Sequence, residues 1–227
     1  MKSDHTATEY RVRVEAIRWL SMSVFELNLE KPAGFSFLPG QKISCVIDGL
    51  SREYSLAGSP GQDKLAICIR LVPGGTVSPR LAELNTGDII SISAPYGYFL
   101  YRPGRGRAVF VATGTGMAPF VSYSLSGVKG YIMLHGEIAV NELYYRNELQ
   151  KNATLYVPCL SDEEENLVKL NEGFSGRVTT YLRERLPKDT YTFYLCGNGA
   201  MIRDAVEVID RQFPMSRVFT ETFFISD

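Results

Sequence analysis

The stretch VFVATGTGMAPF, residues 109–120, decides the fold of the second half of the chain. Four apolar residues lead into Thr113, Gly114, Thr115 and Gly116, and Pro119 follows Ala118. A buried strand that ends in glycines brings backbone amides to the start of a helix, where phosphate binds well. No P-loop lysine follows, and a proline replaces the third glycine of the dinucleotide fingerprint. Because proline fits the first turn of a helix, the stretch predicts a pyrophosphate site; the alternative is a plain connecting turn.

A second glycine turn, LCGNGAM at residues 195–201, changes the balance between these alternatives. It also follows an apolar strand and opens a predicted helix. Two such turns at the carboxyl end of one parallel sheet favour a dinucleotide that lies across both. Cys196 would face the ligand, although a free cysteine more often fills a core.

Composition places the chain among ordinary globular proteins. It has 227 residues, a hydrophobic fraction of 45% and a formal net charge of −1, so no basic excess indicates nucleic acid binding. No apolar run approaches the roughly 18 residues of a membrane span, and the polar N-terminus lacks a signal-peptide core; we expect a cytoplasmic protein. The four cysteines form no Cys-x-x-Cys pair and only two histidines occur, so we expect no metal site.

The first hundred residues predict an antiparallel β-barrel, because short alternating strands are separated by Pro/Gly turns. The expected strands are Tyr10–Ile17, Val24–Leu29, Lys42–Ile47, Lys64–Val72 and Asp88–Ala94, with one short helix over Pro79–Leu84.

After a Gly/Pro/Arg segment at residues 102–106, apolar strands alternate with helical patterns, which predicts an α/β domain with a parallel sheet. The expected strands are Ala108–Ala112, Gly130–His135, Thr154–Pro158, Tyr191–Cys196 and Val218–Phe224. The expected helices are Ala118–Leu125, Val140–Lys151, Arg177–Leu186 and Ala200–Phe213. We therefore expect a two-domain protein, with a β-barrel domain over residues 1–102 and a nucleotide-binding α/β domain over residues 107–227; the resemblance described below implies that the barrel binds a flavin.

The barrel half carries a second set of candidate ligand residues. Arg52 and Tyr54 share one face of a strand, where a guanidinium can bind a diphosphate and a tyrosine ring can stack on a flat heterocycle. Ser55 can hydrogen-bond a ring nitrogen. The alternative is an exposed strand with an ordinary Arg–Tyr pair.

The stretch VPGGTVSPRL, residues 72–81, predicts an anion site before a short helix. Its backbone amides and hydroxyls come from Gly75, Thr76, Val77 and Ser78. A glycine turn with a serine N-cap is the alternative.

In this order, the motifs resemble those of the ferredoxin–NADP reductase family over nearly the whole chain. Arg52–Ser55 is similar to its Arg-x-Tyr-Ser flavin motif, and Gly75–Ser78 to its Gly-x-x-Ser pyrophosphate motif. Pro95–Phe99 is similar to its Pro-x-Gly-x-Phe segment. Thr113–Phe120 resembles the nicotinamide-dinucleotide turn, and Cys196, Gly197 and Met201 match a Cys-Gly-x-x-x-Met motif.

The resemblance implies hydride transfer between a nicotinamide and a flavin, with Ser55, Cys196 and Glu221 as the catalytic candidates. Tyr54 would stack on the flavin, Ser55 would bond its N5 atom, and Thr115 would approach it. A C-terminal aromatic, Phe223 or Phe224, would shield the ring. Glu221 would relay protons or tune the reduced flavin, or it is simply a solvated strand-end acid. The diphosphate motifs favour FAD; FMN is the alternative because no long adenine-binding loop is evident.

The sequence departs from the family pattern around the nucleotide ribose. Relatives that use NADPH often carry an arginine where Asp162 follows Ser161, and Glu163–Glu165 comes next. This acidic run favours NADH, whereas Arg177 resembles a second phosphate-binding arginine of bacterial relatives. Glu137 stands where many relatives have another arginine.

The implied electron acceptor is a one-electron carrier on a separate protein, such as a ferredoxin, a flavodoxin or an oxygenase component. A basic rim for an acidic partner is expected from Lys42, Arg80, Arg102, Arg105 and Arg107, or these belong to an ordinary solvated surface. A free-flavin or quinone reductase and a non-catalytic electron-transfer subunit are the alternative functions.

Overall fold

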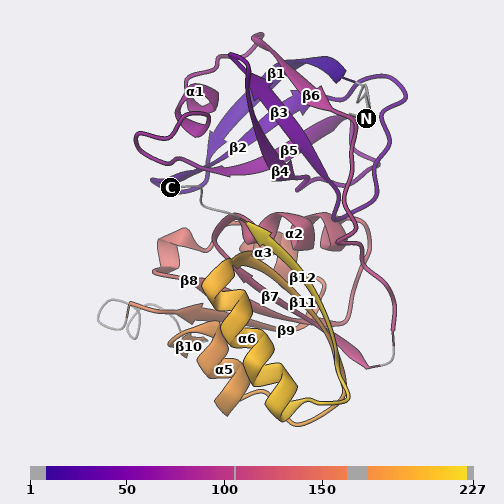
Figure 1. The fold of residues 1–227 in the computed structure, drawn as a ribbon, viewed down its shortest axis with the longest axis vertical. Coiled ribbons are helices and arrows are strands. Elements are labelled where there is room, and N and C mark those ends of the chain that lie inside the picture. Colours follow the sequence, from indigo (N-terminus) through magenta and orange to yellow (C-terminus); the bar gives the residue numbers. More distant parts are fainter. Residues whose placement is uncertain (1–8, 105, 163–172, 224–227) are drawn as a thin grey trace, which may run out of the picture. The chain divides into compact units, whose positions relative to one another are not determined.

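The computed structural model describes residues 9–104, 106–162 and 173–223 (Figure 1). The chain divides into two compact units, residues 1–100 and 101–227. Among the helices that the structure describes, none combines the length and the apolar character needed to cross a membrane.

The first unit is a six-stranded antiparallel sheet with the strand order β4-β3-β6-β1-β2-β5. Its strands are β1 (Glu9–Trp19), β2 (Val24–Glu30), β3 (Lys42–Ile47), β4 (Leu50–Ser55), β5 (Lys64–Arg70) and β6 (Ile89–Ser93). A register shift between Val14 and Ala16 marks where β1 passes from β6 to β2; such irregularities bend a strand. A bridge between Leu56 and Ile67 joins the two edges, so the sheet curls into a near-barrel.

The barrel interior follows from the alternation of apolar residues along the strands. Phe25, Leu27 and Leu29 of β2 are fully buried in one apolar core. The short helix α1 (Ser78–Ala82) adds Leu81 to that core, and the preceding Val77 joins it. The turn before α1 is therefore anchored on the barrel.

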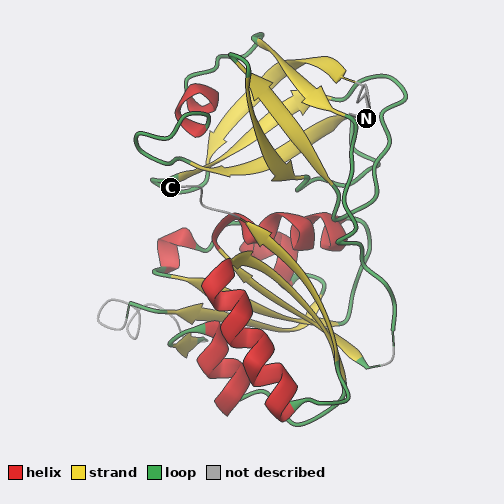
Figure 2. Cartoon of the chain, viewed as in Figure 1, coloured by secondary structure: helices red, strands yellow, loops and turns green. Residues whose placement is uncertain are grey.

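The second unit is a six-stranded parallel sheet with the order β10-β9-β8-β7-β11-β12. Figure 2 shows its strands in yellow and its helices in red. Its strands are β7 (Arg107–Thr113), β8 (Tyr131–Glu137), β9 (Ala153–Leu160), β10 (Phe174–Ser175), β11 (Tyr191–Asn198) and β12 (Arg217–Phe223). Its α-helices are α2 (Ala118–Leu125), α3 (Arg146–Gln150), α5 (Val178–Glu184) and α6 (Gly199–Gln212), with 3-10 helices η1 (Gly114–Met117) and η2 (Val140–Glu142).

The predicted fold class is confirmed, but one predicted helix is wrong in extent. The expected helix over residues 140–151 is broken into η2 and α3. Between them Leu143, Tyr144 and Tyr145 are buried, and Tyr145 adopts a left-handed backbone with φ 58°. A left-handed residue cannot continue a right-handed helix, so the segment leaves helical geometry at Tyr145.

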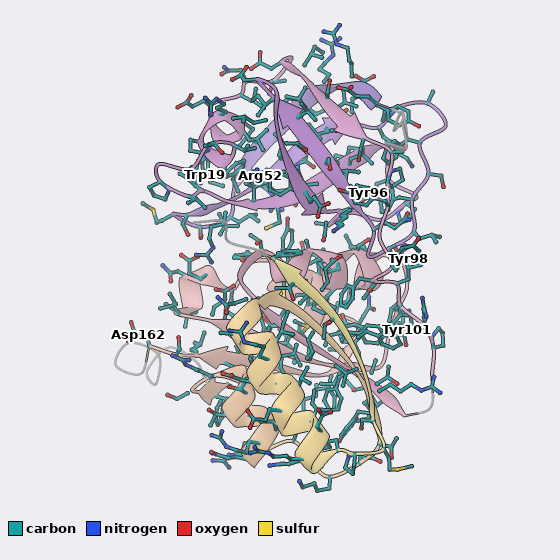
Figure 3. The ribbon with its side chains drawn as sticks, in the orientation of Figure 1. Trp19, Arg52, Tyr96, Tyr98, Tyr101 and Asp162 are labelled. Atoms are coloured by element: carbon teal, nitrogen blue, oxygen red, sulfur yellow. The ribbon has the colours of Figure 1, made fainter. Side chains whose placement is uncertain are left out.

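The start of the second unit is tied to its sheet by a tyrosine. The Tyr194 hydroxyl donates to the Arg102 carbonyl oxygen (3.0 Å) and accepts from the Arg102 amide (2.9 Å). The ring of Tyr101, labelled in Figure 3, lies 5.7 Å from that of Tyr194. These contacts hold the incoming chain beside β11.

Candidate functional site

The two glycine turns of the second unit are in direct contact. β7 and β11 are neighbours, with Ala112 opposite Cys196. A Cβ atom on Gly116 would lie 2.4 Å from the Cys196 carbonyl oxygen, and one on Gly197 would lie 2.6 Å from the Thr113 carbonyl oxygen. Each turn therefore needs a glycine because the other turn occupies the side-chain space.

Backbone conformation gives a second reason for glycine at residue 197 and also favours glycine at residue 114. Gly114 and Gly197 have φ angles of +57° and +132°, which residues with a side chain rarely adopt. Pro119 lies in the first turn of α2, as its missing N–H predicts. Here the 3-10 helix η1 precedes α2, so Gly114–Met117 supplies the first amides after the strand; such amides have no acceptor within their helix.

Asn198 organises the second turn. Its amide donates to the Thr113 hydroxyl oxygen at 3.3 Å. Its side-chain oxygen accepts from the amides of Ala200 (2.8 Å) and Met201 (3.4 Å) and so caps α6. Asn198 thus joins the predicted site residues Thr113 and Met201 through hydrogen bonds.

Cys196 and the C-terminal strand lie side by side. β11 pairs with β12 so that Cys196 is opposite Glu221 and Asn198 is opposite Phe223. Cys196 is fully buried, and burial raises the pKa of its thiol well above the usual value, with a further rise from the Glu221 carboxylate. Phe224 lies outside the described residues, and contact of Cys196 with a nicotinamide stays a prediction.

The candidate ribose residues meet at the carboxyl end of β9. The Asp162 amide donates to the Ile138 carbonyl oxygen (3.0 Å), and the Gly176 amide donates to that of Leu160 (2.7 Å). These bonds bring exposed Asp162 (Figure 3) and exposed Arg177 to the same edge of the sheet. Ser161 is also exposed there, whereas Glu163–Glu165 lies outside the described residues.

Glu137 is turned into the protein rather than toward this edge. It is buried, and its Oε1 atom lies 3.8 Å from Nε2 of fully buried His135. The other ring nitrogen of His135 shares a 2.6 Å hydrogen bond with the Tyr156 hydroxyl. Burial lowers the pKa of His135, although Glu137 favours its protonated form. Glu137 thus lies beside a buried imidazole, and among the described residues its Oε1 atom has no hydrogen-bond partner.

Gly136 is a further glycine that packs against the Thr113 turn and that the sequence analysis did not single out. A Cβ atom there would lie 2.8 Å from Cγ1 of Val178 and 2.9 Å from Cγ2 of Thr113. It makes the third close contact around the Thr113 turn. Its position near the end of the apolar strand β8 is the signal that could have found it.

In the first unit, β4 presents Arg52 and Tyr54 as the strand pattern predicts. They lie opposite Cys45 and Ile43 of β3. Arg52 is exposed, whereas Tyr54 packs against the barrel core and burial raises the pKa of its phenol. Ser55 follows with only 3% of its surface exposed. β4 thus presents a cation, a fixed ring and a buried hydroxyl along one edge strand.

The second candidate motif of this unit forms a closed turn before α1. The Gly75 amide donates to the Val72 carbonyl oxygen (2.9 Å), and the Val72 amide donates to the Ser78 hydroxyl (3.0 Å). Within the described residues, the amides of Thr76 and Val77 donate to no backbone acceptor. These amides and the remaining proton of the Ser78 hydroxyl fit an anionic diphosphate.

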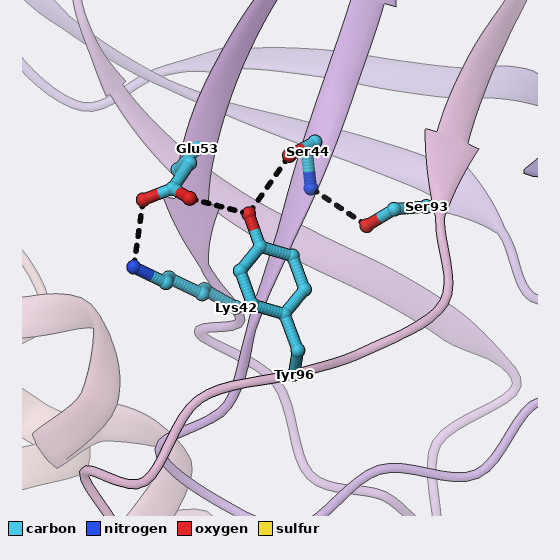
Figure 4. A network of polar contacts seen from close by, with 5 residues as sticks. All are labelled: Lys42, Ser44, Glu53, Ser93 and Tyr96. Carbon is cyan, nitrogen blue, oxygen red and sulfur yellow. Dashed lines mark hydrogen bonds and ion pairs between the residues drawn. The ribbon is translucent and has the colours of Figure 1, made fainter. Parts of the chain in front are cut away.

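Glu53, the variable residue of the flavin motif, belongs to a polar network that the sequence analysis missed (Figure 4). It accepts from Lys42 Nζ (2.6 Å) and from the Tyr96 hydroxyl (2.6 Å), and that hydroxyl lies 2.8 Å from the Ser44 hydroxyl. In the sequence, Glu53 is marked only by its position between Arg52 and Tyr54. The network ties β3 and β4 to the Pro95–Phe99 segment.

Two of the cations expected to form a basic rim are already in ion pairs within the first unit. Lys42 pairs with Glu53, and Arg80 pairs with Asp48 at 3.0 Å. Arg105 lies outside the described residues. Arg102 and Arg107 are not among the ion pairs that the structure describes, so they are the remaining candidates.

Comparison with known families identifies both units. Residues 12–101 match the oxidoreductase FAD-binding domain, and residues 110–207 match the oxidoreductase NAD-binding domain. The chain is 30% identical over 222 residues to the xylene/toluene monooxygenase electron transfer component XylA of Pseudomonas putida, covering 90% of this chain and 63% of that protein. The chain thus spans less than two thirds of the length of this curated relative.

Two solved structures share the fold. A ferredoxin NADP⁺ reductase from Neisseria gonorrhoeae, with bound FAD and NADP, has a TM-score of 0.84 at 19% identity and covers 96% of this chain and 100% of its own. The cytochrome P450 reductase GcoB of Amycolatopsis has a TM-score of 0.82 at 26% identity, over 96% of this chain and 71% of its own.

Proposed function

The chain belongs to the ferredoxin reductase-like family of flavoproteins, with an oxidoreductase FAD-binding domain followed by an oxidoreductase NAD-binding domain, and on this premise we propose that it is an NAD(P)H-dependent FAD reductase that supplies electrons to a separate protein. One observation carries the proposal: the turns at Gly116 and Gly197 are in contact at the carboxyl ends of β7 and β11. Parallel sheets bind dinucleotides at such strand ends.

The residues of the first unit fit FAD. Tyr54 supplies a ring whose position is fixed by packing on the barrel core, and Ser55 supplies a hydroxyl at the end of the same strand. Arg52 and the amides of the Gly75–Ser78 turn supply positive charge and donors for a diphosphate. When bound, FAD takes an electron pair from NAD(P)H and can release the electrons singly, while the protein supplies position and electrostatics.

The residues of the second unit fit the nicotinamide dinucleotide. The backbone of Thr113–Gly116 would approach the pyrophosphate closely, and Pro119 and Ala118 would start the helix behind it. Gly197 and Met201 would border the nicotinamide, with Cys196 beneath them. Glu221 and Phe223, on the next strand, would border the reaction site; Phe224 remains the alternative shielding residue.

For the nucleotide specificity, we favour NADH over NADPH. The exposed Asp162 carboxylate at the end of β9 would accept from a ribose hydroxyl and repel a 2′-phosphate. Arg177, on the same edge, would attract a 2′-phosphate and so favour NADPH. Steady-state kinetics separate the two effects: Asp162→Asn should raise kcat/KM for NADPH relative to NADH, and Arg177→Ala should lower it. A wild-type preference for NADPH would rule out this assignment.

For the partner, we favour the terminal component or ferredoxin of an oxygenase system. XylA is by name the electron transfer component of a monooxygenase, and GcoB is by name a cytochrome P450 reductase. This chain contains no Cys-x-x-Cys pair, so an iron–sulfur centre would lie outside the 227 residues. Ferredoxin and flavodoxin should each be tested as acceptors for the reduced protein.

Two other functions on the same fold give different results in simple experiments. A free-flavin or quinone reductase would lose its flavin during gel filtration, whereas the proposed reductase retains it. A non-catalytic subunit would purify in a stoichiometric complex and show little NADH oxidation alone.

The proposed function is tested by the visible spectrum of the purified protein. We expect a yellow protein that binds one FAD per chain, and a Tyr54→Ala variant that binds it at least tenfold more weakly. Tyr54→Phe, which keeps the ring, should retain most of the affinity. A colourless protein that stays colourless with added FAD or FMN would contradict the proposal.

A further inference from the structure

Three exposed apolar side chains occur near the ends of β1 and β5. Trp19, the only tryptophan of the chain, is the last residue of β1 and keeps 49% of its surface exposed (Figure 3). Met22, in the next turn, is 89% exposed, and Val72, just beyond β5, is 38% exposed. Large exposed apolar groups are notable when they gather near a candidate ligand site.

Strand topology brings these three residues to one end of the barrel. β1 and β5 are both antiparallel to β2, so they run in the same direction and finish at the same end. Trp19 is opposite Phe25, and Phe25 is opposite Ile69. The Leu71 amide donates to the Ser23 carbonyl oxygen at 2.8 Å, which joins the β1–β2 turn to the chain leaving β5.

The same chain leads directly into the turn assigned above to the FAD pyrophosphate. The Val72 amide donates to the Ser78 hydroxyl (3.0 Å), and the Gly75 amide donates to the Val72 carbonyl oxygen (2.9 Å). Val72 is therefore bonded directly to the Gly75–Ser78 turn, and Trp19 and Met22 lie at the same end of the barrel. In FAD the adenosine follows the pyrophosphate immediately, whereas FMN ends at its single phosphate.

We propose that Trp19 stacks on the adenine of FAD and thereby makes the chain select FAD over FMN. The inference rests on the proposed function, because it takes the pyrophosphate to lie at the Gly75–Ser78 turn. One side of the indole already packs on Phe25, with ring centroids 5.2 Å apart. A ring held in this way loses little freedom on binding, and about half of the surface of Trp19 is exposed to solvent.

The lone tryptophan provides a direct signal for the first test. Indole fluorescence of the flavin-free protein, excited where its 13 tyrosines absorb little, is followed during titration with ADP and separately with inorganic pyrophosphate. ADP is the probe because it carries the adenine without a flavin, whose absorption would quench the indole from a distance. We expect ADP to quench the emission and pyrophosphate to leave it unchanged.

The second test measures dissociation constants for FAD and FMN by calorimetry. We expect wild-type protein to bind FAD at least tenfold more tightly than FMN. Stacking of a base on an aromatic side chain implies that Trp19→Ala weakens FAD binding by about 5- to 160-fold and leaves FMN binding within about twofold. Trp19→Phe should keep most of the FAD affinity. Ile89→Ala, which alters a side chain of similar exposure (44%) on β6, is the matched control.

The outcomes separate this inference from the proposed function. If wild-type protein binds FAD and FMN equally, or if ADP leaves the indole emission unchanged, the inference is wrong while the reductase function stands. If neither flavin binds, both fail. Because Trp19→Ala also removes a contact with Phe25, its thermal unfolding must be recorded, and the ADP titration tests the inference without any substitution.

Discussion

The α-carbon of Gly116 faces the carbonyl oxygen of Cys196 so closely that a Cβ atom would lie 2.4 Å from it. This contact joins the turn after β7 to the turn after β11. The three atoms nearest to such a Cβ all belong to the backbone of Cys196 and Gly197, so glycine at residue 116 is what lets the two turns approach each other.

The first prediction concerns Gly116→Ala. The added methyl group must displace the Cys196 backbone, so we expect the unfolding free energy to fall by about 1–3 kcal/mol and NADH binding to weaken at least tenfold. Calorimetry of the folded variant measures the affinity. Gly61→Ala is the control, because its nearest heavy atom, the Ser59 hydroxyl oxygen, lies 4.0 Å away. Equal NADH affinity in wild-type protein and Gly116→Ala would contradict the assignment of this turn.

The second prediction concerns the thiols. All four cysteines are buried, and burial raises the pKa of Cys45 to about 12 and those of Cys159 and Cys196 above their usual values. A thiolate is the reactive form, so we expect dithionitrobenzoate at mildly alkaline pH to label the native protein far more slowly than the urea-unfolded chain. Rapid labelling of Cys196 in the native protein, located by peptide mass, would show that the β11 turn opens.

The third prediction concerns His135 and pH. Burial lowers its pKa, against the opposing effect of Glu137. The unfolded chain therefore takes up a proton near pH 6.5 that the folded imidazole does not. The unfolding free energy should fall as the pH drops below about 6.5, by at most ~1.4 kcal/mol per pH unit.

Urea unfolding between about pH 5 and pH 8 measures this dependence. His135→Gln should unfold with a flatter pH profile over that range. An unchanged profile would mean that His135 is not held neutral in the folded protein.

The fourth prediction concerns the network around Glu53. Burial alone would raise the pKa of this carboxyl, but hydrogen bonds from Lys42 and Tyr96 outweigh burial and lower it. Tyr96→Phe removes one of these donors. Because Glu53 is more than half exposed, solvent screens the interaction and we expect a loss of only about 0.5–1 kcal/mol at neutral pH.

The pH dependence of that loss identifies its source. A carboxyl with a lowered pKa stabilises the fold above its unfolded value of about 4.3 and ceases to do so as the pH falls through its folded value. The difference between wild-type protein and Tyr96→Phe should therefore shrink in acid. Tyr98→Phe alters a side chain that is 87% exposed. It should change the unfolding free energy neither at neutral pH nor in acid.

Local patterns predicted the fold well because each element carries its own signal. The parallel sheet followed from apolar runs that end in glycine, as in β7 and β11, and the barrel from alternating strands such as β2. The helix expected over residues 140–151 failed because apolar content alone cannot distinguish a helix from a loop that buries Leu143, Tyr144 and Tyr145. That distinction depends on tertiary packing.

The candidate site was predictable where one motif carries the chemistry and not where distant residues meet. The contact of Gly116 with Cys196 spans 80 positions, and only the adjacency of β7 and β11 creates it. The bond of His135 to Tyr156 of β9 and the bond of Glu53 to Tyr96 likewise depend on residues from other parts of the chain. No single segment encodes these relationships.

The most direct test of the account is anaerobic mixing of the FAD-loaded protein with NADH while the visible flavin absorption is recorded. We predict that the absorption bleaches at a rate that saturates with NADH concentration, and that FAD-loaded Gly116→Ala keeps its yellow colour but needs at least tenfold more NADH to reach half of its maximal rate. A protein that binds FAD yet is bleached by neither NADH nor NADPH would contradict the central claim that this chain passes electrons from a nicotinamide nucleotide to its flavin.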